Sequence, residues 1–215
     1  MYDYQKHLNL LVERYPALAP QRHTIEQAYF AIQECYKSGG KLLIAGNGGS
    51  ASDAEHMVGE LMKTFVLRRK IDASFADKLR EIDADLGDVL AKNLYGALPA
   101  IALTGHYSLT TACINDGEPL LCFAQQVNGY GKAGDVFIGI STSGNSKNVL
   151  YAATVAKAKG MKVVGLTGAK PSKLSEIADV CIMAPSTETY MIQEYHLPIY
   201  HALCLMVEER IFGRA

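Results

Sequence analysis

One stretch of the sequence, residues 135–149, constrains the fold more than any other. In it the apolar run Val136–Ile140 leads directly into a loop of small hydroxyl residues that opens a helix. The free backbone N–H groups of a helix's first turn point at one place, and the helix dipole favours an anion there. Further donors come from the hydroxyl groups of Ser141, Thr142, Ser143 and Ser146. The pattern predicts a cradle for a phosphate group; the alternative is a serine N-cap after a tight turn.

The ligand of this cradle is expected to be small. A nucleotide-triphosphate P-loop needs the pattern Gly-x-x-x-x-Gly-Lys-Ser/Thr, and residues 141–146 contain no lysine. The whole chain has 21 basic and 22 acidic residues, a net charge of −1, so no overall field draws it to nucleic acid or to an anionic membrane. The charge of a ligand must therefore be met locally.

Composition restricts the class of protein further. A length of 215 residues suits a single α/β domain with helical extensions. The first residues lack a signal-peptide pattern, and no apolar run of about 18 residues occurs that could span a bilayer. The cysteines are scattered without a Cys-x-x-Cys pair, which is typical of reduced thiols in the cytoplasm and argues against a zinc–cysteine site. They are Cys35, Cys113, Cys122, Cys181 and Cys204. We therefore expect a cytoplasmic protein.

Five short apolar runs, separated by helical patterns, predict the strands of one sheet. They are Lys41–Ala45, Ala100–Leu103, Val136–Ile140, Lys162–Leu166 and Val180–Ala184. Strands that alternate with helices pair in parallel through right-handed crossovers. The fold class is therefore α/β, a three-layer sandwich around a five-stranded parallel sheet, with ligands at the carboxyl ends of the strands.

Helices are expected at both ends of the chain and in one insertion. Residues 1–40 form a helical extension with helices at about Tyr4–Tyr15 and Thr24–Ser38, and a final helix covers about Thr189–Ile211. Their apolar faces fit either an oligomer interface or a cover for the sheet, and the pattern does not distinguish the two. Residues 67–97 are dense in charge and carry apolar residues at helical spacing, which predicts an inserted helical arm.

A second loop of small residues, Gly46–Ser52, follows the first strand. Its pattern Gly46-x-Gly48-x-x-Ala51 nearly matches the dinucleotide fingerprint. A dinucleotide site needs an acidic residue about 20 positions later at the end of a second strand, and residues 67–70 are Leu-Arg-Arg-Lys with no strand before them. A nucleotide-dependent oxidoreductase is thus the weakest of the functions considered.

Two further sets of polar residues are candidates for chemistry. His56 and Glu60 stand four apart on the helix after this loop, so they share a face and offer an imidazole and a base to one substrate. The alternative is a solvated surface pair. The last helix carries a second set, Gln193, Glu194, His196 and His201. If these side chains are buried, they need hydrogen-bond partners. The alternative is that they form a solvent-exposed stripe on the helix.

The spacing within the last helix limits what one ligand can touch. Gln193 and His201 are about 12 Å apart along an ideal helix. One small ligand therefore reaches both only if the side chains lean together or Pro198 bends the axis. His196, one turn from Gln193, is the competing candidate.

Together these motifs resemble the sugar isomerase (SIS) fold, and within it the phosphoheptose isomerases. The resemblance runs from about Lys41 to Phe212, interrupted by the arm. It is carried by Gly46-Asn-Gly-Gly-Ser50, His56, Glu60, Asn115-Asp116, Gly139-Ile-Ser-Thr-Ser-Gly-Asn-Ser146, Leu166-Thr-Gly168, Gln193-Glu194 and His201.

The resemblance implies roles for these residues. Ser50 and the loop Ser141–Ser146 would bind the sugar phosphate. The sugar chain would be lined by Asn47, Gly48, Gly49, Asn115 and Asp116. A zinc ion, one per subunit, would be held by His56, Glu60, Gln193 and His201, whose nitrogen and oxygen donors suit that metal. The resemblance also implies a homo-oligomer, a tetramer by analogy, with active sites at subunit boundaries.

The implied reaction converts sedoheptulose 7-phosphate into D-glycero-D-manno-heptose 7-phosphate through an enediol. Glu60 is then the base and His201 the acid. If zinc occupies the same side chains, the metal polarises the carbonyl instead, and the sequence leaves both open. The alternative is a non-catalytic SIS module that senses a phosphosugar or binds the replication initiator DnaA; the DnaA-binding branch lacks equivalents of Glu60 and His201.

This chain also departs from the family pattern. Tyr190 and Met191 stand where the family usually has a polar or basic residue, Thr64 stands where an arginine is common, and the arm is longer than the usual link. A different phosphosugar substrate therefore stays open.

Overall fold

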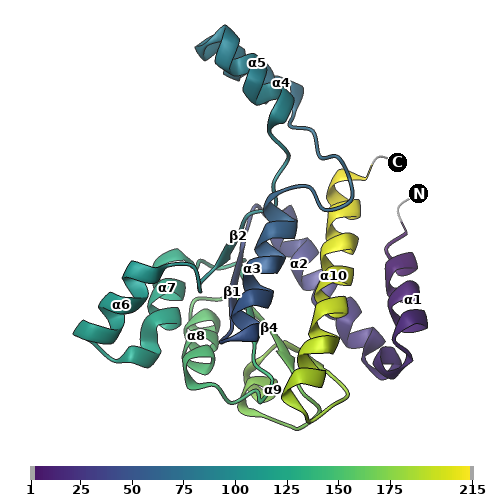
Figure 1. Ribbon diagram of the computed structural model, residues 1–215, viewed down its shortest axis with the longest axis vertical. Helices are drawn as coiled ribbons and strands as arrows, with labels where there is room; N and C mark the ends of the chain where they lie inside the picture. The colour runs from purple at the N-terminus through teal and green to yellow at the C-terminus, as the bar shows by residue number, and fades with distance from the viewer. Residues whose placement is uncertain (1–2, 214–215) are drawn as a thin grey trace.

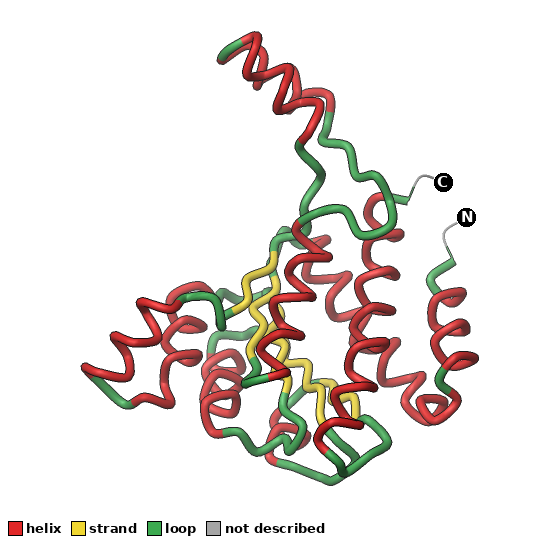
Figure 2. The backbone as a smooth tube through the Cα atoms, viewed as in Figure 1, coloured by secondary structure: helices red, strands yellow, loops and turns green. Residues whose placement is uncertain are grey.

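The computed structural model describes residues 3–213 and contains one parallel five-stranded sheet (Figures 1 and 2). The strands are β1 (Leu42–Ala45), β2 (Ala100–Ala102), β3 (Val136–Ile140), β4 (Lys162–Thr167) and β5 (Val180–Met183). Their spatial order is β2-β1-β3-β4-β5, the flavodoxin-like order and not the 3-2-1-4-5-6 order of dinucleotide-binding folds. The predicted fold class is confirmed, and the strand bounds agree with the prediction to within one residue.

Helices surround the sheet on both faces. They are α1 (Gln5–Arg14), α2 (Arg22–Lys37), α3 (Gly49–Met62), α4 (Ala73–Ile82), α5 (Ala84–Asn93), α6 (Tyr107–Asp116), α7 (Cys122–Tyr130), α8 (Lys147–Ala158), α9 (Lys173–Ile177) and α10 (Thr189–Phe212). Two short 3-10 helices, η1 (Pro16–Gln21) and η2 (Pro119–Leu121), link α1 to α2 and α6 to α7. None of the helices within residues 3–213 is long and apolar enough to cross a membrane.

Alternate residues of each strand face opposite layers, as the period of a strand requires. Leu42 and Ile44 of β1 pack in one cluster with α1, α2, α3 and α10. Leu43 and Ala45 pack in the other cluster with α7, α8 and α9. The terminal helices therefore cover the sheet, which is one of the two roles that their apolar faces allowed.

The topology brings the two predicted ligand loops together. β1 and β3 are neighbours, with Ala45 paired to Gly139. The chain leaves β1 into α3 on one face and leaves β3 into α8 on the other (Figure 1). Ligands bind in such sheets at the crevice where consecutive connections go to opposite faces, and this crevice lies between β1 and β3.

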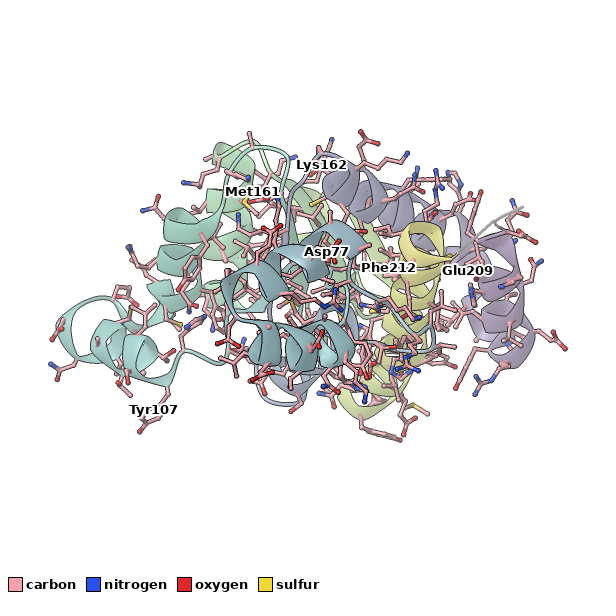
Figure 3. All side chains as sticks on the ribbon, turned by 90° about the horizontal axis from the view of Figure 1, so that it is seen from above. Asp77, Tyr107, Met161, Lys162, Glu209 and Phe212 are labelled. Carbon is pink, nitrogen blue, oxygen red and sulfur yellow. The ribbon has the colours of Figure 1, made fainter. Side chains whose placement is uncertain are left out.

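Two helical segments extend from this body. Helices α4 and α5 pack against each other as the inserted arm, which rises from the end of α3 (Figure 1), and an antiparallel bridge between Lys70 and Tyr95 closes its base. Helix α6 projects to one side. In the view from above, Tyr107 lies at that edge of the molecule, with 79% of its surface exposed, while Glu209 of α10 lies towards the other edge (Figure 3).

Candidate active site

The glycine-rich loop after β1 is built for a close approach of backbone to backbone. A Cβ on Gly46 would lie 2.4 Å from the backbone oxygen of Ser50, and Gly48 has a φ of 56°. A Cβ on Gly49 would lie 2.4 Å from Nε2 of Gln193, so the loop contacts the first turns of α10. A side chain on Gly46 would clash with the backbone of Ser50, and one on Gly49 would clash with Gln193, so only glycine fits at these two positions.

The loop after β3 has a comparable construction. Gly144 has a φ of 63°, and a Cβ there would lie 2.0 Å from Oγ of Ser172. Ser146 is the N-cap residue of α8, yet its hydroxyl makes no capping hydrogen bond and lies 3.0 Å from Oγ of Ser141. The serine N-cap alternative is therefore wrong for Ser146. In the first turn of α8 the N–H of Val149 donates to Oδ1 of Asn148, while those of Lys147 and Asn148 have no side-chain acceptor among residues 3–213 and are free for an anion.

A cavity of about 270 Å³ adjoins this loop. Thr142 and Ser143 line one side, the segment from Gly168 to Pro171 after β4 lines the next, and the start of α10 closes the third. Lys170 is the cation of this lining. The sequence analysis did not single out Lys170, although its position two residues after Gly168 at the carboxyl end of a strand was a usable signal.

The two ligand loops are also tied to each other. The side-chain amide of Asn47 donates to Oδ1 of Asn148 at 3.0 Å, and the amide of Asn148 donates back to Oδ1 of Asn47 at 2.8 Å. Ser50 is buried at the start of α3. The structure therefore brings Asn47 and Ser50 to the same end of the sheet as the hydroxyl loop.

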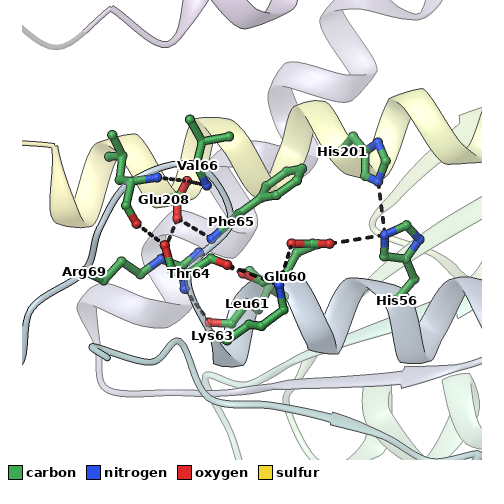
Figure 4. A network of polar contacts seen from close by, with 11 residues as sticks. His56, Glu60, Leu61, Lys63, Thr64, Phe65, Val66, Arg69, His201 and Glu208 are labelled. Carbon is green, nitrogen blue, oxygen red and sulfur yellow. Dashed lines mark hydrogen bonds and ion pairs between the residues drawn. The ribbon is translucent and has the colours of Figure 1, made fainter. Parts of the chain in front are cut away.

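A cluster of titratable side chains joins α3 to α10 (Figure 4). Nε2 of His56 lies 3.2 Å from Oε1 of Glu60 and 3.4 Å from Nε2 of His201. The Glu60 side chain is 13% exposed, and His201 packs its ring 5.4 Å from that of Phe65. His56 and Glu60 are therefore more than a solvated surface pair, because both belong to an interhelical cluster.

Two residues that the sequence analysis missed complete this cluster. Oη of Tyr200 lies 2.9 Å from Nδ1 of His56 and donates to Oδ1 of Asp53 at 3.3 Å. Burial raises the pKa of the Asp53 carboxyl, an effect that the Tyr200 hydrogen bond and the nearby His56 oppose. Burial, together with the nearby His56, lowers the pKa of His201. Asp53 stands three positions before His56 and Tyr200 directly before His201, which is the signal that could have found them.

Comparison with known proteins identifies the family of this chain. A family model described as SIS domain matches residues 3–85 and 80–168. The phosphoheptose isomerase of Aneurinibacillus thermoaerophilus is 42% identical over 87% of this chain and 82% of the relative. This chain belongs to the phosphoheptose isomerase family of SIS-domain proteins. The predicted family is thus confirmed.

Other members of the phosphoheptose isomerase family match over similar lengths. Phosphoheptose isomerase 2 of Campylobacter jejuni is 41% identical over 88% of this chain and 82% of the relative. The solved phosphoheptose isomerase from Neisseria gonorrhoeae superposes with a TM-score of 0.73 at 31% identity, covering 95% of this chain and 96% of that one. The likeness therefore includes the helical ends as well as the sheet.

The structure decides between the two histidines of α10 in this family member. His196 is buried, its Nε2 lies 3.2 Å from the backbone oxygen of Thr167, and burial lowers its pKa to about 4. His196 as the competing site residue is therefore wrong: it is a neutral histidine of the core. Glu194 is exposed, so the alternative of an exposed stripe holds for that residue alone among the four.

Helix α10 continues through Pro198 without a break. Gln193 lies against the glycine-rich loop and His201 lies against His56, so the two residues contact different parts of α3 and its loop. The structure thus brings three of the four predicted ligands into one cluster, namely His56, Glu60 and His201, and sets Gln193 about two helical turns away along α10.

Asn115 and Asp116 stand apart from these residues. They end α6, are exposed, and bond to each other through the Asn115 amide and Oδ1 of Asp116 at 2.7 Å. Helix α6 contacts α7 and η2 and lies on the far side of the molecule from α10 (Figure 1). Within one chain the structure does not bring Asn115 and Asp116 to the other site residues. Their contact with a sugar stays a prediction.

Proposed function

We propose that this chain is an aldose–ketose isomerase that interconverts sedoheptulose 7-phosphate and D-glycero-D-manno-heptose 7-phosphate. The observation that carries the proposal is the cluster of Glu60, His56 and His201 on α3 and α10. Helix α3 begins in the glycine-rich loop, and the start of α10 contacts that loop and lines the cavity beside the hydroxyl loop. The curated relatives carry the name of the same activity over more than four fifths of this chain.

In the isomerisation, Glu60 acts as the base and His201 as the acid. Glu60 removes a proton from the carbon beside the carbonyl while His201 donates a proton to the carbonyl oxygen, and an enediol forms. Return of a proton to the neighbouring carbon and loss of the hydroxyl proton then give the aldose. Burial lowers the pKa of His201, which makes its protonated imidazole a stronger acid towards the carbonyl oxygen.

We also propose a zinc-bound form of this cluster, in which His56, Glu60 and His201 would hold the metal with Gln193 as a further ligand; the proton transfers by Glu60 and His201 described above belong to the metal-free form. Within residues 3–213, no three His, Cys, Asp or Glu side chains already surround a single metal position. The donors nevertheless fit: ligand atoms of a tetrahedral zinc stand about 3.3 Å apart, and those on His56, Glu60 and His201 are separated by 3.2 and 3.4 Å. Zinc, when bound, polarises a carbonyl oxygen as a Lewis acid.

We further propose that residues 1–215 act as a single SIS domain in a cytoplasmic homo-oligomer, a tetramer by analogy with the family. What supports an oligomer is the set of exposed apolar side chains on the outer faces of α1 and α10 and on the arm. Among them are Leu10, Leu197, Ile82 and Leu86, which are 49%, 41%, 84% and 64% exposed. Such side chains are commonly covered at subunit contacts.

The test separates turnover from binding. Purified protein is incubated with a panel of ketose phosphates, with zinc or with a chelator, and aldose formation is followed by NMR. In the presence of the chelator, Glu60→Gln is expected to lower kcat by at least a hundredfold while ligand affinity stays within about threefold, because the metal-free variant loses only the proton acceptor. Ser143→Ala with Ser146→Ala is expected to weaken phosphosugar binding about tenfold or more, because two hydroxyl donors are lost.

Glu34→Gln is the matched control, because this glutamate lies on α2 with 76% of its side chain exposed. Turnover that survives Glu60→Gln means that Glu60 is not the base. Binding without turnover in the unsubstituted protein, for every sugar of the panel, identifies the chain as the non-catalytic alternative.

A further inference from the structure

We infer that Tyr200 and Asp53 are positioning residues that decide which ring nitrogen of His56 carries its proton. This inference rests on the proposed function, because it gives His56 its role within that same cluster. It adds a relay behind the imidazole that neither the family pattern nor the spacing of the motifs assigned.

The relay is a chain of contacts across two helices. Asp53 lies one turn before His56 on α3, and Tyr200 reaches both from α10. Tyr200 is only 1% exposed, and its ring stands edge-on to that of His56 at 5.5 Å between centroids. The hydroxyl therefore sits inside the structure between a carboxylate oxygen and Nδ1 of the imidazole.

The hydroxyl has one proton to donate, so only one of two arrangements is possible at a time. In the first, Tyr200 donates to Asp53 and accepts from Nδ1–H of His56. In the second, Tyr200 donates to Nδ1 and turns away from Asp53. Oδ2 of Asp53 is buried and has no partner among residues 3–213. With Asp53 ionised, the second arrangement would leave both carboxylate oxygens without a donor, which is the more costly state for a carboxylate partly removed from water.

The first arrangement leaves Nε2 of His56 without a hydrogen. That nitrogen faces Nε2 of His201 and also Oε1 of Glu60, a carboxylate that favours the opposite tautomer, so without a metal Tyr200 and Asp53 compete with Glu60 for the position of the His56 proton. A bare imidazole nitrogen is the form that ligates a metal or accepts a proton, and the partner of the other nitrogen commonly sets it. Tyr200 and Asp53 thus prepare His56 for the cluster from the side of its ring where the buried Tyr200 lies.

The decisive variant is Tyr200→Phe, which removes a single oxygen, with Tyr195→Phe on the same helix as its matched control. The tautomer of His56 is read in zinc-free protein from ¹⁵N shifts of its ring, assigned with His56→Gln. We expect Tyr200→Phe to shift His56 from Nδ1–H towards Nε2–H. Zinc affinity, measured by competition with a chelator, is expected to fall about 10- to 100-fold, while Tyr195→Phe changes neither quantity.

Kinetics separate this role from a purely structural one. Tyr200→Phe is expected to lower kcat about tenfold or more while KM for the sugar phosphate stays within twofold, because the phosphate loops are untouched. Asp53→Asn is the second variant, and its effect on zinc affinity is expected to be less than additive with that of Tyr200→Phe, because both interrupt one chain of contacts.

An unchanged tautomer and an unchanged zinc affinity in Tyr200→Phe would overturn the inference even if the enzyme is active. Loss of the proposed function gives a different pattern: the unsubstituted protein then shows no turnover, while the ring shifts and the zinc titration still report on the relay.

Discussion

The two histidines of α10 have different environments. His201 joins the cluster with His56, whereas His196, five positions earlier, is buried with a pKa lowered from 6.5 to about 4 by burial. Between these two pH values His196 is protonated in the unfolded chain but not in the folded chain. Folding stability is therefore lost as the pH falls from about 6.5 towards 4, and this histidine contributes about 2 kcal/mol of that loss by pH 5.

Urea unfolding at pH 7.5 and pH 5.0, at one protein concentration, checks this prediction. His196→Leu is expected to lower stability at pH 7.5 but to reduce the difference between the two pH values by about 2 kcal/mol. The control is His23→Gln, since the His23 side chain is 77% exposed. An equal pH dependence in His196→Leu and the unsubstituted protein would contradict the assignment of His196 as a neutral core residue.

At the scale of elements, one buried ion pair joins the end of α3, the base of the arm and α10 (Figure 4). Nε of Arg69 lies 2.7 Å from Oε1 of Glu208, with side chains 0% and 1% exposed. Arg69 also donates to the backbone oxygens of Leu61 and Glu60, and Glu208 accepts from the backbone N–H of Phe65. The pair therefore fixes the position of the end of α3 relative to α10, close to Glu60 and His201.

Arg69→Met is expected to lower the free energy of unfolding by about 3–5 kcal/mol, because it leaves the Glu208 carboxylate buried without its cation. Urea unfolding measures the loss. Arg80→Met on the arm is the control, since the contacts of Arg80 with Asp77 and Asp88 are exposed, and we expect its unfolding midpoint to stay unchanged. A small effect of Arg69→Met would mean that water or another donor satisfies Glu208.

At the scale of the whole molecule, the outer surface of α1 and α10 forms a groove of about 200 Å³. Leu10 and Leu197 line it, and so does His201 of the site. A second subunit that covers this groove would therefore also enclose the acid of the proposed reaction. If the proposed oligomer uses this groove, oligomerisation and turnover are therefore expected to depend on one surface.

Leu10→Glu combined with Leu197→Glu is expected to shift the mass in solution from a multiple of 23.4 kDa towards 23.4 kDa and to lower kcat. A charge placed in an apolar contact must be desolvated on association, which weakens it. Light scattering after size exclusion measures the mass. Tyr151→Glu on α8, in the other layer, is expected to leave it unchanged. A monomeric unsubstituted protein would contradict the proposed oligomer.

Much of the fold was predictable because local patterns carry it. Val136–Ile140 was predicted with the bounds that the structure has, because a short run of four apolar residues and one glycine, too short for a helix and flanked by turn residues, is typical of a buried strand. The i, i+4 geometry of His56 and Glu60 was also predictable, because a helix alone decides it. The projection of α6, which takes Asn115 and Asp116 away from the loops, had no such local signal.

By itself, the sequence determined the alternation of strands and helices, the two loops of small residues and the family, since each depends on residues that are near one another in the chain. Only the tertiary structure decided that His201 and not His196 meets His56, and that Tyr200 and Asp53 stand behind that imidazole. Those contacts join residues about 145 positions apart. They depend on how α10 is rotated against α3. That rotation is set by the packing of the whole apolar face, so no local sequence pattern predicts it.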